Sequence, residues 1–75
     1  MRYALTSHAR DKMHDLGVTE DDIQRVLDGP HTTRRSQLYS ETTLISATVR
    51  GRRIILATVR GSQPLLIKTI MERAS

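Results

Sequence analysis

The first third of the chain carries apolar residues at helical spacing. One face of a first helix is formed by Ala9, Met13 and Leu16. Ser7 stands just before this face and is a good N-cap, with Thr6 as the other option. Gly17 follows the last apolar position, where a left-handed C-cap is needed. These signals predict a helix over residues 7–16.

A second helix has a complete start signal. Thr19 is its N-cap, and Asp22 stands at the capping-box position, with Asp in place of the usual Glu. The apolar stripe of this helix is formed by Ile23, Val26 and Leu27. Gly29 and Pro30 cannot continue it, so the pattern predicts a helix over residues 19–28.

The apolar period changes from 3.6 to 2 after a polar segment over residues 31–36, which we interpret as a loop. Residues 37–49 predict either one long strand or two short strands that meet near Glu41. Residues 52–60 and 64–71 predict two more strands. Residues 50–51 fit a two-residue hairpin turn, and residues 61–62 fit the type II′ pattern with Gly first.

These turns predict a register between the strands. The first turn pairs Val49 with Arg52, Ala47 with Ile54 and Ile45 with Leu56, and the second pairs Leu56 with Ile67 and Thr58 with Leu65. One face is then apolar, formed by Ile45, Ala47, Val49, Ile54, Leu56, Leu65 and Ile67. Thr69 is turned toward this face, and the other face receives Ser46, Thr48, Arg53, Ile55, Lys68 and Ile70. The predicted fold class is therefore α+β, with two N-terminal helices packed on one face of a small antiparallel β-sheet.

The composition limits the domain count and excludes several kinds of site. A chain of 75 residues has room for one domain, over residues 1–75. It has no Cys, which excludes disulfides, thiolate metal sites and a cysteine nucleophile. We see no secretory signal and no apolar stretch near the ~20 residues that span a bilayer, so the expected location is cytoplasmic, with no membrane partner. No P-loop, dinucleotide motif or pair of His at metal-ligand spacing is present, and we expect no cofactor and no metal.

Charge is divided unevenly along the chain. Residues 1–33 carry a net charge of −2, whereas residues 34–75 carry seven Arg and one Lys against two Glu, a net charge of +6. A basic half in a short chain indicates a polyanionic partner, with nucleic acid as the first candidate. The alternative is that Arg solubilises a sheet edge.

Three residues could carry chemistry on a phosphodiester. His8 lies in the first turn of the first helix, where the positive end of the helix dipole favours the neutral imidazole that a general base needs. Arg53 and Lys68 lie near each other in the predicted register, on the face without helices, where cations could stabilise phosphate charge. The alternatives are that His8 is a surface residue beside a cap and that the two cations belong to a solvated sheet face.

The sequence also resembles a known short bacterial domain. The matching segments are Leu5-Thr-Ser-His-Ala-Arg-Asp-Lys-Met13, Leu16-Gly-Val-Thr-Glu-Asp-Asp-Ile23 and Val26-Leu-Asp-Gly-Pro30, followed by Thr48-Val-Arg-Gly-Arg-Arg-Ile-Ile55 and Leu66-Ile-Lys-Thr-Ile70. They are similar to a domain-of-unknown-function family related to BrnT and, more distantly, to the RelE and ParE toxins. The resemblance implies a RelE-like fold and a metal-independent endoribonuclease that is the toxin of a toxin–antitoxin pair. Leu16 departs from the pattern, because an Arg commonly precedes the Gly there.

Together these observations predict RNA cleavage without a metal. His8 is the expected acid or base, and Arg53 and Lys68 are the expected phosphate stabilisers. Arg10, Lys12, Arg50 and Arg52 are expected to contact the RNA backbone. The expected partners are RNA and a cognate antitoxin protein. The alternative is a non-catalytic module that binds nucleic acid or protein, including an immunity-type partner.

Overall fold

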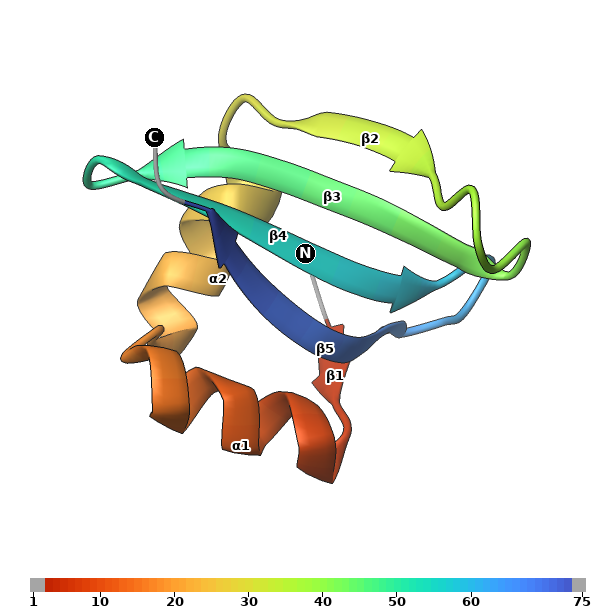
Figure 1. Ribbon diagram of the computed structural model, residues 1–75, viewed down its shortest axis with the longest axis horizontal. Coiled ribbons are helices and arrows are strands. Elements are labelled where there is room, and N and C mark those ends of the chain that lie inside the picture. Colours follow the sequence, from red (N-terminus) through yellow and green to blue (C-terminus); the bar gives the residue numbers. More distant parts are fainter. Residues whose placement is uncertain (1–2, 74–75) are drawn as a thin grey trace.

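The computed structural model describes residues 3–73 and shows an α+β arrangement of two helices and a five-stranded mixed sheet (Figure 1). The elements are β1 (Tyr3–Leu5), α1 (Ser7–Leu16), α2 (Glu20–Asp28), β2 (Thr32–Arg35), β3 (Thr42–Val49), β4 (Arg52–Val59) and β5 (Leu65–Arg73). The strand order is β1-β5-β4-β3-β2. β1 runs parallel to β5 and the other neighbours are antiparallel, so the expectation of a purely antiparallel sheet that follows the helices is wrong.

The predicted caps set the bounds of both helices. Thr6, rather than Ser7, is the N-cap of α1, and its hydroxyl oxygen accepts a hydrogen bond from the backbone N–H of Ala9 at 3.1 Å. Gly17 ends α1 with a φ of 67°, the left-handed conformation that favours glycine. Thr19 and Asp22 form the predicted capping box at the start of α2, which ends at Asp28.

β2 corrects the expectation of a loop over residues 31–36. Its four residues are all exposed, so it has no apolar alternation for a sequence pattern to show. β2 lies at the edge of the sheet and pairs only with β3, with Arg34 opposite Leu44. Backbone hydrogen bonding to β3 therefore forms this strand without any contribution from side-chain burial.

The hairpin between β3 and β4 has the predicted turn and register. Arg50 and Gly51 have φ angles of 54° and 77°, as the two central residues of a type I′ turn require. The pairs of Val49 with Arg52, Ala47 with Ile54 and Ile45 with Leu56 are all confirmed.

The predicted register between β4 and β5 is wrong. Thr58 lies opposite Ile67 rather than Leu65, and a β-bulge between Ala57 and Thr58 then adds one further residue, so that Leu56 lies opposite Ile70. The connection also runs over residues 60–64 instead of a two-residue turn. The bulge places an extra residue, Lys68, in β5 and breaks its period of two. Ile67 and Ile70 are consequently both fully buried, which corrects the expectation that Ile70 lies on the face without helices.

The core lies between the helices and one face of the sheet. α1 contacts β5 and β1, and α2 contacts β3. The apolar stripe of α2 packs in the same cluster as the apolar residues of the three central strands, which are Ile45, Ala47, Val49, Ile54, Leu56, Ile67 and Ile70. We call the opposite face of the sheet the outer face. No helix within residues 3–73 is long and apolar enough to cross a membrane.

Candidate nucleic-acid interface

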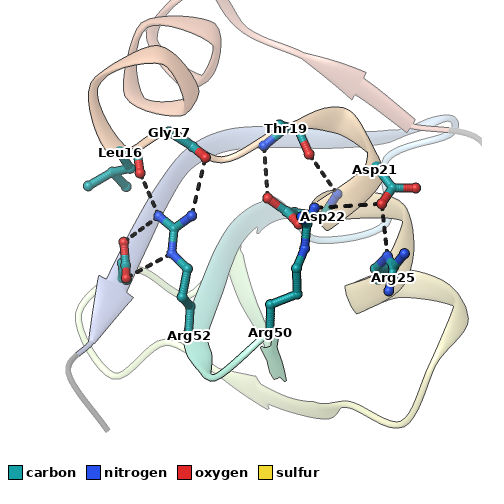
Figure 2. A network of polar contacts seen from close by, with 9 residues as sticks. Leu16, Gly17, Thr19, Asp21, Asp22, Arg25, Arg50 and Arg52 are labelled. Carbon is teal, nitrogen blue, oxygen red and sulfur yellow. Dashed lines mark hydrogen bonds and ion pairs between the residues drawn. The ribbon is translucent and has the colours of Figure 1, made fainter.

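Arg50, one of the expected RNA contacts, is held against the start of α2 (Figure 2). Its guanidinium donates a hydrogen bond to the Asp22 carboxylate at 2.7 Å and lies 3.7 Å from the Asp21 carboxylate. The Asp22 side chain is 5% exposed, whereas that of Arg50 is 58% exposed. The hydrogen bond from the Thr19 backbone N–H lowers the pKa of Asp22, and Arg50 lowers it further. Arg50 therefore completes a capping site from the β3–β4 turn.

Arg52, a second expected RNA contact, joins three elements. Its guanidinium donates two hydrogen bonds to the Glu72 carboxylate of β5, at 3.0 and 2.6 Å. It also donates to the carbonyl oxygens of Leu16 and Gly17 at the end of α1, at 2.5 and 3.2 Å (Figure 2). The carbonyl oxygens at a helix C-terminus attract cations. The hydrogen bonds from Arg52 lower the pKa of Glu72. All of these contacts are internal to the fold.

The expected residues of the first helix lie on α1, which packs against the core face of the sheet. His8 is exposed in the first turn of α1, as expected from the cap. Arg10 is exposed and borders a shallow hollow with Met13 and His14, and Lys12 is half-buried. This placement separates His8 from the outer face, where Arg53 lies.

Arg53 and Lys68 do not lie near each other, because the long β4–β5 connection and the β-bulge together shift β5 against β4. Arg53 lies opposite Arg73, five residues along β5 from Lys68. The Lys68 ammonium donates to the Thr42 hydroxyl at 2.5 Å, and the Arg53 guanidinium donates to the Ser46 hydroxyl at 3.5 Å. Thr42 and Ser46 are four residues apart on β3, which is about 13 Å in a strand. One phosphate group cannot bridge these two cations.

A different set of cations meets on the outer face, in a hollow that we call the arginine pocket. Its volume is about 150 Å³, and its lining residues are Thr32, Arg34, Leu44, Ser46, Arg53, Ile55 and Arg73. Arg34 comes from β2, Arg53 from β4 and Arg73 from β5. Among residues 3–73, no carboxylate forms an ion pair with any of these three arginines. The pocket therefore concentrates uncompensated positive charge beside two hydroxyl groups.

Sequence reasoning missed Arg34 and Arg73 for two different reasons. Arg34 falls in the segment interpreted as a loop, although its Thr-Thr-Arg-Arg sequence is compatible with an edge strand. Arg73 lies beyond the predicted end of the last strand, and only the shifted register places it beside Arg53. Extending the strand pattern past residue 71 would have included Arg73 in the last strand, but not opposite Arg53.

Two further findings concern metal binding and similarity to known proteins. Within residues 3–73, no three His, Asp or Glu side chains gather closely enough to hold a metal ion. Comparisons of the chain with protein-family models, with curated proteins and with solved structures give no significant match. The site is therefore interpreted from its own geometry.

Proposed function

We propose that this protein binds RNA through the arginine pocket on the outer face of its sheet. The observation that carries the proposal is the cross-strand pair of Arg53 and Arg73, with Arg34 lining the same pocket. Like charges directly opposite each other destabilise a sheet, and no carboxylate within residues 3–73 compensates these. The negative charge of a bound phosphate group would offset this repulsion, and the guanidinium fork matches the phosphate oxygens.

The position of the pocket supports a polymeric anion. The helices pack on the core face, so the outer face is accessible to a long ligand (Figure 1). Thr32 and Ser46 add hydroxyl groups that can donate to phosphate or sugar oxygens. Lys68 lies about 13 Å along the sheet from the Arg53 contact, and a second phosphate of the same RNA chain is its proposed ligand.

Binding is favoured over catalysis. Metal-free cleavage needs an acid, a base and cations around one phosphodiester. His8, Arg53 and Lys68 are distributed over a helix on the core side and two distant positions on the sheet. Cleavage in a toxin–antitoxin pair thus stays a prediction from the family resemblance. The non-catalytic nucleic-acid-binding module, the alternative from the sequence, fits the geometry better.

The proposal is tested by fluorescence anisotropy with a short labelled single-stranded RNA at a series of salt concentrations. Four contacts, from the three arginines of the pocket and Lys68, predict a slope of log K against log salt of about −3, from about −0.7 per contact. Arg53→Gln and Arg73→Gln should each weaken binding and make the slope shallower by about 0.7. An affinity that does not depend on salt would contradict the proposal.

Arg25→Gln is the matched control. Arg25 is an exposed arginine of α2 that pairs with Asp21, and its replacement changes the net charge by the same amount. If Arg25→Gln weakens RNA binding as much as Arg53→Gln does, binding depends on net charge and the arginine pocket is not the site. The same samples, incubated with a chelator and analysed for RNA fragments, also test cleavage and its dependence on His8 through His8→Ala.

A further inference from the structure

The outer face also carries a groove with an unusual concentration of exposed apolar side chains. The large hydrophobic residues that are most exposed within residues 3–73 are Leu38, Tyr39 and Met71, at 84%, 63% and 39%. All three line one groove of about 610 Å³, which we call the outer groove. Leu38 and Tyr39 come from the β2–β3 connection and Met71 comes from β5. Exposed apolar groups gathered in one concave place indicate a docking surface.

The floor of the outer groove is aliphatic. It is formed by the sheet residues Leu44, Ile55 and Ala57, between the β2–β3 connection and Met71. Only Tyr39 is aromatic among the residues that line the groove. RNA bases bind preferentially on aromatic platforms, so this floor suits aliphatic side chains of a protein better than it suits bases.

The charges around the groove are positive. Arg34, Arg73 and Lys68 line it, and Lys68 holds its ammonium 6.0 Å from the centre of the Tyr39 ring. Glu72 also borders the groove, but its carboxylate pairs with Arg52. A partner that complements this surface has apolar side chains along one side and carboxylates beside them.

We propose that the outer groove binds the apolar face of an acidic amphipathic helix from a partner protein. The floor is a sheet surface, and a sheet surface packs well against the apolar stripe of a helix, as the core face of this same sheet does with α2. A second copy of this chain does not supply such a stripe. The apolar residues of its α2, Ile23, Val26 and Leu27, are already buried in its own core.

This docking does not depend on RNA binding. It has a consequence that does rest on the proposed function, because Arg34 and Arg73 belong to both the outer groove and the arginine pocket. A helix seated in the groove occupies these two cations and Lys68, which also lines the groove, and excludes RNA from all three. Arg53 lines the arginine pocket but not the outer groove, so replacing Arg53 distinguishes RNA binding from helix binding.

The test uses a synthetic labelled helical peptide with Leu at positions i, i+4 and i+7 and Glu between them, titrated with the whole protein. A peptide with Lys in place of Glu and one with Ser in place of Leu are the ligand controls. We expect the acidic peptide alone to bind. Leu38→Ser should weaken its binding about tenfold, the change that corresponds to about 1.4 kcal/mol.

Gln37→Ser is the matched protein control, since Gln37 is an exposed neighbour in the same connection that does not line the outer groove. It should leave peptide binding unchanged, and so should Arg53→Gln, which is expected to weaken RNA binding. If Arg53→Gln loses RNA binding but still binds the acidic peptide, the docking proposal is supported independently of the proposed RNA binding. No binding of the acidic peptide, or equal binding by Leu38→Ser, would overturn it. Self-association in sedimentation experiments that Leu38→Ser abolishes would also overturn it, in favour of a second copy.

Discussion

Replacing Asp22 tests directly whether the contact between α2 and the β3–β4 turn stabilises the fold. Its carboxylate is nearly fully buried and accepts two hydrogen bonds, from the Thr19 backbone N–H at 3.1 Å and from the Arg50 guanidinium at 2.7 Å. Its own backbone N–H donates to the Thr19 hydroxyl at 3.2 Å. Asp22→Ala removes both acceptors and leaves the Thr19 N–H without its partner.

The magnitude follows from these contacts. A hydrogen bond to a charged group contributes about 1.5–3 kcal/mol, and the pair with the largely exposed Arg50 adds at most about 1 kcal/mol. We therefore expect Asp22→Ala to lower the free energy of unfolding by about 2–3 kcal/mol. Asp22→Asn keeps an acceptor for Thr19 and should cost about half as much. A domain of this length has a total stability of roughly 4–11 kcal/mol, so the effect is large.

The assay is urea unfolding followed by far-ultraviolet circular dichroism, with the free energy extrapolated to water. Asp21→Ala is the matched control, because Asp21 is adjacent in the first turn and also near Arg50, but its side chain is 63% exposed. It should change stability by at most about 0.5 kcal/mol. If Asp22→Ala costs no more than Asp21→Ala, the capping site does not stabilise the fold as argued.

The same contacts make stability depend on pH. The pKa of Asp22 is lower in the folded protein than in the unfolded chain, where it has the ordinary aspartate value of about 3.9. Its stabilising contribution is therefore fully present above that value and is lost as the pH falls through the lower, folded-state pKa. Asp22→Asn should lose less stability than the wild type between neutral pH and acid. An unchanged acid profile would contradict the assignment.

Further predictions concern caps, turns and register. Thr6→Ala should lower stability by about 1–2 kcal/mol in urea unfolding, since Thr6 caps α1 and also donates to the Lys68 carbonyl oxygen. Gly51→Ala should destabilise by about 1 kcal/mol in the same assay, because its φ is 77°. Ile70→Ala should cost about 2–5 kcal/mol; a cost below about 0.5 kcal/mol would place Ile70 on the surface. In Arg52→Gln the pKa of Glu72, followed by NMR titration, should rise toward its ordinary value.

Rules for helix caps and tight turns correctly predicted those parts of the fold that a few neighbouring residues determine. The capping box of Thr19 and Asp22, the left-handed Gly17 and the Arg50–Gly51 turn each depend on a few consecutive residues. The chemistry of those residues leaves few conformations open, so the helix bounds and the register of the first hairpin followed directly from the sequence.

The remaining elements depend on pairing between distant segments. β1 has three residues and is formed by parallel pairing with β5, more than 60 residues away in the chain. β2 has no buried residue and is formed by pairing with β3. Neither strand has an apolar alternation, so the hydrophobic pattern contains no signal for them.

The predicted proximity of Arg53 and Lys68 is wrong because it depends on the β4–β5 register, which shifts at the β-bulge between Ala57 and Thr58. Continued alternation in β5 would put Ile67 and Ile70 on opposite faces, and the bulge instead turns both into the core. Thr69 consequently lies opposite Ala57 and lines the outer groove together with Lys68, contrary to the expectation that Thr69 faces the helices.

The bulge is tied to the start of α1. The Thr6 backbone N–H donates to the Ile67 carbonyl oxygen at 3.1 Å, and the Thr6 hydroxyl donates to that of Lys68 at 2.9 Å. One residue therefore caps the helix and fixes the irregular segment that carries Lys68. The same shift brings Arg73 opposite Arg53, and so it creates the arginine pocket at the other end of β5. The position of Arg73 opposite Arg53, and with it the grouping of three arginines around one pocket, is thus a consequence of where β5 breaks its alternation.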